Sequence, residues 1–322
     1  MRTTLAIAFL AAGILASGAR ADGLPVFDVD VGPDGVATAS VRYVALPAPR
    51  STLLARVRLS DGRIERFRSL RGRFTIPAVA YDGTPDGLAA DGRTLVLIQP
   101  RAGFPRRATR LAVVDTASLK LRREILLRGD FSFDAVSPDG RWLYLIRYLS
   151  ADDPNAYEVR VFDLERGRLL RRPIVDPAES GEEMRGAPVT RATSPDGRWA
   201  YTLYDGAGGH PFVHALDTVG RAARCVDLDE LAGRNDLGAL RLSLEGAILS
   251  VVARGRRALA LIDTRTFRVD APAPAPALVP GAETGPPWLA IGVVVALGGA
   301  VAGGALARRR RAGEAASRLR SP

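Results

Sequence analysis

A short turn motif recurs along the middle of this 322-residue chain and restricts the folds that are open to it. Each copy ends in an acidic residue followed by glycine, and two copies read Ser-Pro-Asp-Gly in full. These acidic and glycine residues are Asp34 and Gly35, Asp91 and Gly92, Asp139 and Gly140, Asp196 and Gly197, and Glu245 and Gly246. Proline starts a turn, aspartate caps it, and glycine accepts the positive φ of a tight hairpin. We therefore predict that these residues form structural turns between strands.

Apolar runs that end in aspartate keep step with the turns. Their aspartates lie 24, 24, 21 and 18 residues after the acidic residue of the preceding turn, at Asp115, Asp163, Asp217 and Asp263. No segment between residues 22 and 270 shows a sustained apolar period of 3.6 residues, so helices are a minor component. Each repeat of about 50 residues thus holds four short strands joined by hairpins.

Four-stranded units repeated around an axis are typical of a β-propeller, in which each blade buries its faces against its neighbours. The sequence therefore predicts an all-β fold, a β-propeller of about five four-stranded blades over residues 22–270. A twisted open stack of the same units is one alternative. Closure of the ring by a sixth, unmarked blade is another.

The repeats also resemble those of known bacterial proteins. The alternation of apolar strands ending in Asp-Thr with Ser-Pro-Asp-Gly-Arg hairpins, clearest from Leu111 to Ile146, is similar to YVTN-type, WD-repeat-like and TolB-type β-propellers. The resemblance covers most of residues 30–270 and implies the propeller fold. Five blades differ from the seven common in YVTN and lactonase-like propellers, and the last turn lacks Pro and Asp. Because the shared motifs are structural turns, the resemblance implies no particular activity.

The two ends of the chain carry targeting signals. Residues 1–21 combine Arg2, an apolar run and the small-x-small sequence Ala19-Arg20-Ala21, which predicts a signal peptide cleaved before Asp22. Residues 288–307 contain no charge and are followed by Arg308–Arg311, which predicts a transmembrane helix with a basic cytoplasmic tail at 308–322. Residues 271–287 are rich in Ala and Pro and should form an extended stalk. We expect a single-pass protein of the cell membrane, with residues 22–270 outside.

A shorter motif near the stalk offers a minor alternative for localisation. The run Gly281-Ala282-Glu283-Thr284-Gly285, followed by an apolar span and a basic tail, resembles the signals that sortases cleave to attach proteins to the cell wall. It departs from that pattern at Gly281, where leucine is expected.

The charge distribution argues against a nucleic-acid partner. The chain has a net charge of +10, but residues 1–21 and 308–322 contribute +2 and +5, which leaves +3 on residues 22–307. Electrostatic binding to nucleic acid needs clustered phosphate contacts. Cys225 is the only cysteine, which excludes an intramolecular disulfide, and it is interpreted as a buried residue of an apolar strand. We predict no metal site, and no cofactor motif is evident.

Candidate ligand-binding residues fall on the longer loops, opposite the uniform turns, where a propeller most often binds. Three classes of side chain stand out there: basic residues that should form a loop tip, acidic loop clusters without EF-hand spacing, and a loop histidine. They are Arg101, Arg106, Arg107, Asp152, Asp153, Glu182, Glu183 and His210. His214 follows within a strand and is interpreted as packed in a blade.

The predicted function is a membrane-tethered extracytoplasmic module that binds a ligand or another protein, with a cell-envelope protein or glycan as the partner. The alternative is a propeller hydrolase or lyase acting on a sugar or lactone at the axial mouth. That enzyme would need carboxylates, or a histidine with carboxylates, lining the mouth within about 5–10 Å of one another.

Overall fold

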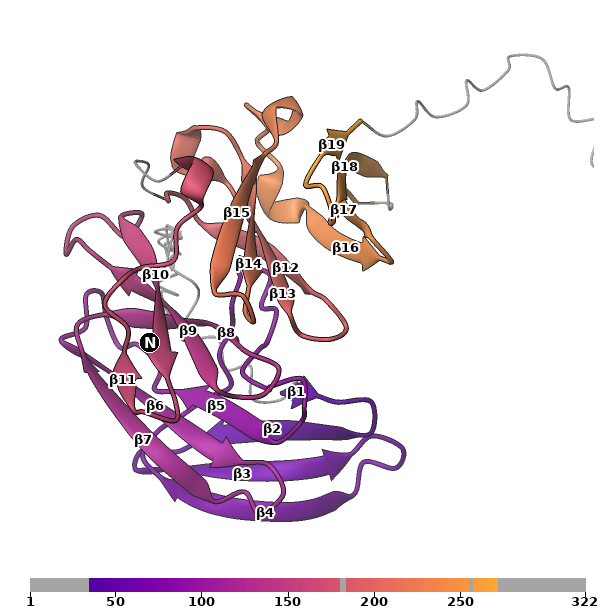
Figure 1. Cartoon of the computed structure of the whole chain (residues 1–322). Coiled ribbons are helices and arrows are strands. Elements are labelled where there is room, and N and C mark those ends of the chain that lie inside the picture. The colour runs from indigo at the N-terminus through magenta and orange to yellow at the C-terminus, as the bar shows by residue number, and fades with distance from the viewer. Residues whose placement is uncertain (1–34, 180–183, 255–256, 272–322) are drawn as a thin grey trace, which may run out of the picture. The chain divides into compact units, whose positions relative to one another are not determined.

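A computed structural model describes residues 35–179, 184–254 and 257–271 (Figure 1). The chain divides into two units, Met1–Pro272 and Ala273–Pro322, and every described residue belongs to the first. The predicted signal peptide, transmembrane helix and tail lie outside the described residues, as do Asp34 and all of the predicted stalk except residue 271. In the part of the chain that is described, no helix is long and apolar enough to cross a membrane.

Five antiparallel sheets follow one another along the chain, and in each the strands pair in sequence order. The first sheet contains β1 (Val36–Ala37), β2 (Val41–Pro47), β3 (Ser51–Arg58) and β4 (Ile64–Arg71). The second contains β5 (Thr94–Ile98), β6 (Ala108–Asp115) and β7 (Leu121–Arg128). The third contains β8 (Phe131–Val136), β9 (Trp142–Tyr148), β10 (Tyr157–Asp163) and β11 (Arg168–Leu169).

The last two sheets repeat the same pattern. The fourth contains β12 (Pro188–Thr193), β13 (Trp199–Tyr204), β14 (Phe212–Asp217) and β15 (Ala222–Asp227). The fifth contains β16 (Arg241–Glu245), β17 (Ile248–Val252), β18 (Ala258–Asp263) and β19 (Val269–Asp270). The described helices are single 3-10 turns at Pro177–Glu179, Gly206–Gly208, Asp229–Leu231 and Leu237–Ala239. The prediction of an all-β fold with few helices is confirmed.

The second sheet departs from the predicted four strands, because its innermost segment is irregular. Residues 72–93 touch the sheet through isolated bridges, Thr75↔Ile98 and Leu88↔Leu95. The segment also reaches the fourth sheet, where Tyr81 N donates to Pro188 O at 2.9 Å. A regular strand would place its hydrogen bonds in one sheet only, whereas this segment also bonds to Thr52 in the first sheet and to Pro138 in the third.

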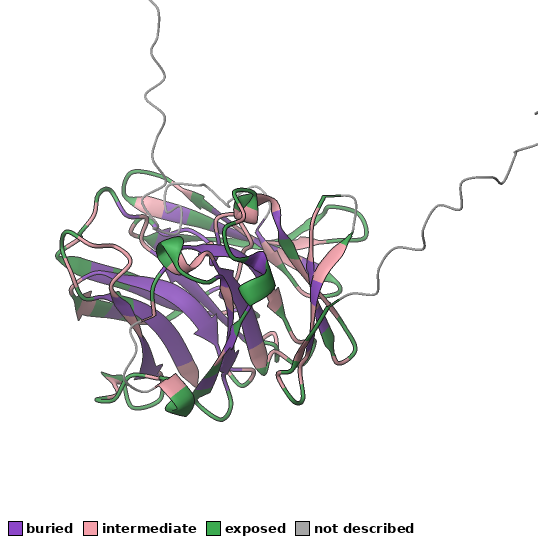
Figure 2. Ribbon diagram, turned by 90° about the horizontal axis from the view of Figure 1, so that it is seen from above, coloured by how far each residue is buried: buried purple, intermediate pink, exposed green. Residues whose placement is uncertain are grey.

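Apolar side chains fill the spaces between successive sheets, and buried residues concentrate in the strands (Figure 2). Each of four clusters joins one sheet to the next. Representative pairs are Leu54 with Leu97, Val96 with Leu143, Tyr144 with Leu216, and Leu203 with Leu249. Among the described residues, none of the four clusters joins the fifth sheet to the first.

Burial along the strands reflects this packing. Every residue of the inner strands β5 and β8 is buried, whereas the outer strand β4 is exposed at all but one position. A strand covered on both faces favours apolar residues on both, as in Leu95–Ile98 of β5. In β8 the buried Ser132 and Asp134 are instead held by a hydrogen bond and an ion pair. Five meandering sheets packed face to face in succession fit the blades of a β-propeller.

The repeated turns join the first and second strands in most sheets. In the third sheet Ser137 Oγ donates to Asp139 Oδ1 at 2.5 Å and accepts a bond from Trp142 N at 2.8 Å. Equivalent bonds of 2.5 and 2.9 Å tie Ser194 to Asp196 and Trp199 in the fourth sheet. The first repeat differs: Gly35 lies immediately before β1, and residues 38–40 form the turn between β1 and β2. The first motif therefore precedes the innermost strand, which was not predicted.

The aspartates that end the third strands cap the following turn. Asp163 Oδ1 accepts bonds from the main-chain N–H groups of Glu165 and Arg166, and Asp263 Oδ1 does the same for Arg265 and Thr266. Hydrogen bonds from Ser118, joined by one from Arg122, lower the pKa of Asp115 to about 2. This capping explains why the second sequence marker recurs in step with the first.

Two of the turn glycines allow a matched test of the hairpins. Gly140 and Gly246 share a left-handed backbone, with φ of +69° and +59°. They differ in the space around them: a Cβ on Gly140 would lie 2.5 Å from Thr94 Oγ1, whereas a Cβ on Gly246 would have no atom within 4 Å. The left-handed backbone alone should make Gly246→Ala cost about 1–2 kcal/mol. Overpacking against the buried Thr94 should make Gly140→Ala cost roughly 1–3 kcal/mol more. Urea denaturation of residues 22–270 measures both, and equal costs would contradict the predicted contact.

Candidate functional site

A cavity of about 630 Å³ opens between the third and fourth sheets. Its walls come from β10, β14 and β15, from the segment that follows β11, and from the 149–156 and 205–211 loops that join the second and third strands. The lining combines apolar side chains with charged or titratable ones. The apolar residues include Leu149, Val159, Ile174, Met184 and Phe212. The charged or titratable residues include Asp176, Glu179, Arg185, His210, Asp227 and Asp229. Pockets with an apolar wall and a few convergent polar groups are typical ligand sites.

The segment after β11 forms this cavity because it bridges the two sheets. Ile174 N donates to Val159 O at 2.8 Å, so the segment first runs beside β10. Asp176 then caps the 3-10 turn Pro177–Glu179 through a bond from Ala178 N to Oδ1 at 2.9 Å, while Oδ2 accepts Cys225 N at 2.8 Å. One buried carboxylate therefore fixes the turn and attaches it to β15 in the fourth sheet.

The two histidines lie in different environments. His210 stands at the cavity with a side chain that is 64% exposed, and its Nδ1 lies 2.8 Å from Asp229 Oδ1. His214 is buried on β14 directly opposite Cys225 on β15, with Nδ1 3.9 Å from Sγ. Burial lowers the pKa of His214 to about 4, so its imidazole is neutral at physiological pH.

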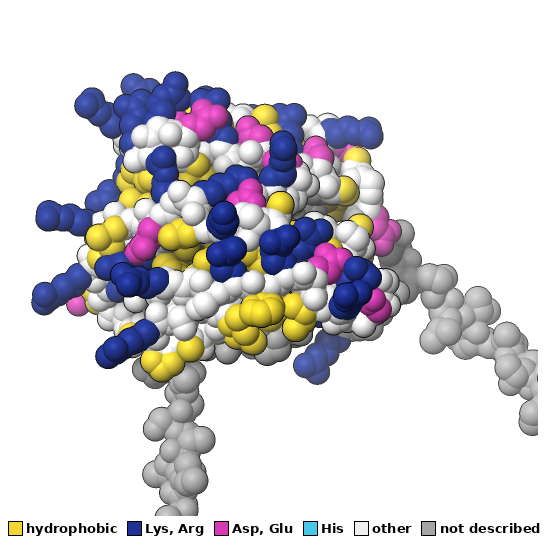
Figure 3. All heavy atoms as spheres, turned by 90° about the horizontal axis from the view of Figure 1, so that it is seen from below, with side chains coloured by type: hydrophobic (Ala, Val, Ile, Leu, Met, Phe, Trp, Pro, Cys, Tyr) yellow, Lys and Arg dark blue, Asp and Glu magenta, His cyan; other side chains and the backbone are white. Residues whose placement is uncertain are grey.

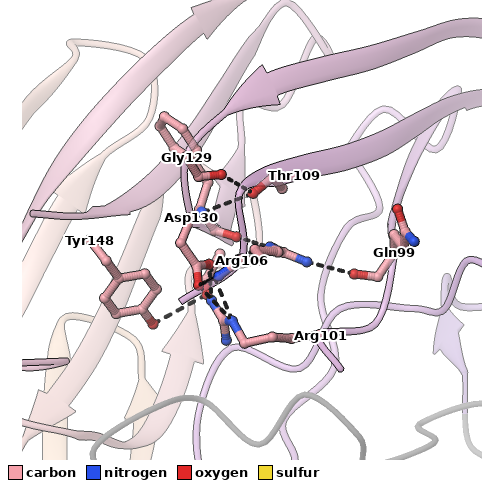
Figure 4. Close-up of polar contacts among 9 residues, drawn as sticks. Gln99, Arg101, Arg106, Thr109, Gly129, Asp130 and Tyr148 are labelled. Atoms are coloured by element: carbon pink, nitrogen blue, oxygen red, sulfur yellow. Dashed lines mark hydrogen bonds and ion pairs between the residues drawn. The ribbon is translucent and has the colours of Figure 1, made fainter. Parts of the chain in front are cut away.

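Two of the basic residues predicted to form a loop tip are instead part of the interior. Arg101 is buried and Arg106 nearly so, and both form ion pairs with the buried Asp130 (Figure 4). Arg106 also donates to Gln99 O at 2.8 Å, and the Arg101 guanidinium lies 5.1 Å from the ring centre of Tyr148. The expectation of a basic tip is wrong for these two residues because the neighbouring Asp130 neutralises and orders them.

Arg107, the third basic residue, is exposed. Basic side chains stand at many places on the face shown in Figure 3, with acidic and hydrophobic groups between them. An exposed arginine therefore does not by itself distinguish this loop from other surfaces of the domain. Its role in binding stays a prediction.

The predicted acidic residues divide between the cavity edge and the solvent. Asp152 is exposed, while Asp153 forms an ion pair with Arg185, a residue of the cavity lining. Asp153 Oδ1 also accepts Asn155 N at 2.9 Å, which orders the 149–156 loop. Glu182 and Glu183 lie outside the described residues.

Carboxylates on the innermost segments are held by an arginine. Arg191 on β12 forms ion pairs with Asp134 on β8 and, at 3.7 Å, with Asp86 in the irregular segment of the second sheet. Arg191 Nε also donates to Thr202 Oγ1 at 2.9 Å. Burial raises the pKa of Asp86 to about 6, against the opposing effect of Arg191. These contacts are those of a structural ion-pair network that joins three sheets.

No protein-family profile matches this chain, and no curated protein does. Among solved structures, TolB from Acinetobacter baumannii is 16% identical with a TM-score of 0.40, covering 72% of this chain and 52% of its own. The Dos1 propeller is 9% identical with a TM-score of 0.43, covering 75% and 58%. A nidogen/laminin complex is 12% identical with a TM-score of 0.39, covering 74% and 78%.

This chain thus spans about half the length of TolB. At such identities and scores the similarity says nothing of function, so the cavity has to be interpreted from its own residues.

Sequence reasoning missed the residues that make the cavity distinctive. Asp176 and Glu179 lie three residues apart at one turn, but Cys225 follows 49 and 46 residues later in β15, and no local spacing connects it to them. One signal was present: His214 and Cys225 stand on either side of the hairpin turn that follows Asp217, so their pairing follows from the predicted hairpin.

The buried cluster of Asp130 with Arg101 and Arg106 should be essential for stability. Asp130→Ala would leave two guanidinium groups without their carboxylate, and breaking a buried pair costs about 3–5 kcal/mol. Arg107→Ala, a change at an exposed neighbour, should alter the free energy of unfolding by less than about 0.5 kcal/mol. Urea denaturation of residues 22–270 gives both values. A small loss for Asp130→Ala would show that the two arginines are solvated after all.

Proposed function

We propose that this protein is a membrane-tethered, extracytoplasmic β-propeller that binds part of a cell-envelope protein or glycan in the cavity between its third and fourth sheets. The cavity is the observation that carries the proposal: about 630 Å³, with an apolar wall and convergent polar groups. Its loops belong to the second-to-third-strand connections, the side opposite the repeated turns.

The charges in the cavity favour a particular chemistry for the ligand. Glu158 is neutralised by Arg147 and Arg160, and Arg185 by Asp153, whereas Asp227 forms no ion pair among the described residues. Together with Asp176, Glu179 and Asp229, it gives the lining an excess of carboxylates. The ligand that matches this lining carries an amino group or several hydroxyl donors for the carboxylates. It also has an apolar part that covers Met184 and Phe212.

The alternative of a hydrolase or lyase at the axis has less support. That chemistry needs a carboxylate free to act as acid, base or nucleophile. Asp134 and Asp86 on the innermost segments are instead ion-paired to the buried Arg191, which orders them as structural groups. A binding module therefore describes the geometry better than an enzyme of this type.

The binding site can be tested by photo-crosslinking in living cells. A photoreactive residue at Leu149, which is 50% exposed and lines the cavity, should form one discrete adduct with the partner. Val219 is 53% exposed on the turn after β14 and does not line the cavity, so the same residue there should give none. Filling the cavity by Met184→Trp should abolish the Leu149 adduct. Equal adducts at both positions, or one that persists in Met184→Trp, would contradict the proposed site.

The proposed membrane topology predicts a distinct labelling pattern. In a Cys225→Ser background, an exposed Ala117→Cys should react with a membrane-impermeant maleimide in right-side-out membrane vesicles. Ser317→Cys in the basic tail should react only after the membrane is permeabilised, because the arginine cluster keeps that end inside. The mature protein should begin at Asp22. Reaction of both cysteines in sealed vesicles would contradict a single span with this orientation.

A further inference from the structure

Three potential metal ligands converge in the cavity. An oxygen of Asp176, an oxygen of Glu179 and the Cys225 sulfur all lie within 4.8 Å of one another. All three residues line the cavity, so an ion from solvent can reach them. They come from two elements that Asp176 itself joins, the 3-10 turn Pro177–Glu179 and β15. The fold therefore positions the cluster, and two main-chain N–H groups already order the Asp176 carboxylate.

A buried imidazole is directed at the same sulfur. His214 is only 1% exposed, its Nδ1 lies 3.9 Å from Cys225 Sγ, and its Nε2 has no hydrogen-bond partner among the described residues. Nδ1 is thus the nitrogen that faces the sulfur, while Nε2 points away from it on the other side of the ring.

The mixture of donors indicates which class of ion would fit. A thiolate suits zinc and similar borderline ions, whereas calcium and magnesium are bound by oxygen ligands. Two carboxylates beside an uncharged thiol repel one another, and a divalent cation would remove that repulsion. Arg224 approaches Asp176 Oδ1 only to 3.6 Å with a side chain that is 54% exposed, so it compensates this charge weakly.

We propose that Asp176, Glu179 and Cys225 form a binding site for a divalent transition-metal ion of the zinc type at the edge of this cavity, with the buried imidazole of His214 facing the sulfur from behind. On binding, the Cys225 thiol gives up its proton to solvent and the thiolate joins the two carboxylates as ligands. Burial and the neighbouring Glu179 raise the pKa of the Cys225 thiol in the metal-free protein, and a bound cation opposes both effects. Affinity should therefore increase with pH, because proton and metal compete for the sulfur. Metal binding at this site can be measured without any organic ligand in the cavity.

Cobalt(II) is the probe of choice, since it replaces zinc in such sites and reports on its ligands. The full-length protein, stripped of metal with a chelator, should bind one Co²⁺ and acquire a thiolate-to-cobalt charge-transfer band together with tetrahedral d–d bands. Zn²⁺ should displace the cobalt. Because Cys225 is the only cysteine, a thiolate band can arise at no other place in the chain, and Cys225→Ser should abolish it.

Variants separate this site from chance binding at the cavity edge. Glu179→Gln, on a partly exposed turn where folding is not at risk, should weaken Zn²⁺ binding at least tenfold in competition with a chromophoric chelator. His210→Gln and Asp229→Asn alter the exposed pair at the cavity and should leave affinity unchanged. Absence of a saturable thiolate band, or affinity lost with His210 and kept in Glu179→Gln, would overturn the proposal.

Discussion

Arg191 holds together three parts of the molecule that are distant in the chain. From β12 it reaches Asp134 on β8 and Asp86 in the irregular segment of the second sheet, and it is buried with Asp134. A buried guanidinium has to be neutralised and hydrogen-bonded, so the third and fourth sheets can approach only in a register that brings both carboxylates to it. The space between β10, β14 and β15 depends on that register. The cavity is thus a consequence of how two neighbouring sheets are fixed near their innermost strands.

The repeat was readable from sequence because its determinants are local. A Ser-Pro-Asp-Gly turn is specified by φ preferences and by bonds between residues two to five positions apart, such as those from Ser137 to Asp139 and Trp142. The aspartates that end the third strands act equally locally, since each accepts hydrogen bonds from the main-chain N–H groups two and three residues further along the chain. Fold class and strand order therefore followed from the sequence. The irregular second sheet did not, because residues 72–93 divide their hydrogen bonds among several sheets, from Thr52 in the first to Pro188 in the fourth.

The candidate site was less accessible to sequence reasoning for the same physical reason. Arg101 and Arg106 belong to a polar loop, and only Asp130, at the start of the next sheet, removes them from the surface. Charge alone cannot show whether an arginine is solvated or paired inside. His210 lies in a loop after four Gly or Ala residues and is exposed, whereas His214 lies within an apolar strand and is buried, as its position in the strand indicated. What the sequence could not show was that Asp176 and Glu179, from another segment, lie beside the thiol that His214 faces.

A cavity that combines a thiol and two carboxylates with an apolar wall has a consequence for which ligands it could bind. Without a cation, the carboxylates of Asp176 and Glu179 repel one another and favour a ligand that brings positive charge. With a cation, the same groups are neutralised, and the remaining acidic residues, Asp227 and Asp229, lie nearer the solvent. The ion would also tie β15 to the turn Pro177–Glu179 and so stiffen one wall of the cavity. The affinity for the metal and the affinity for the ligand would then be coupled through this wall, because each bound species changes the charge at the other's binding position.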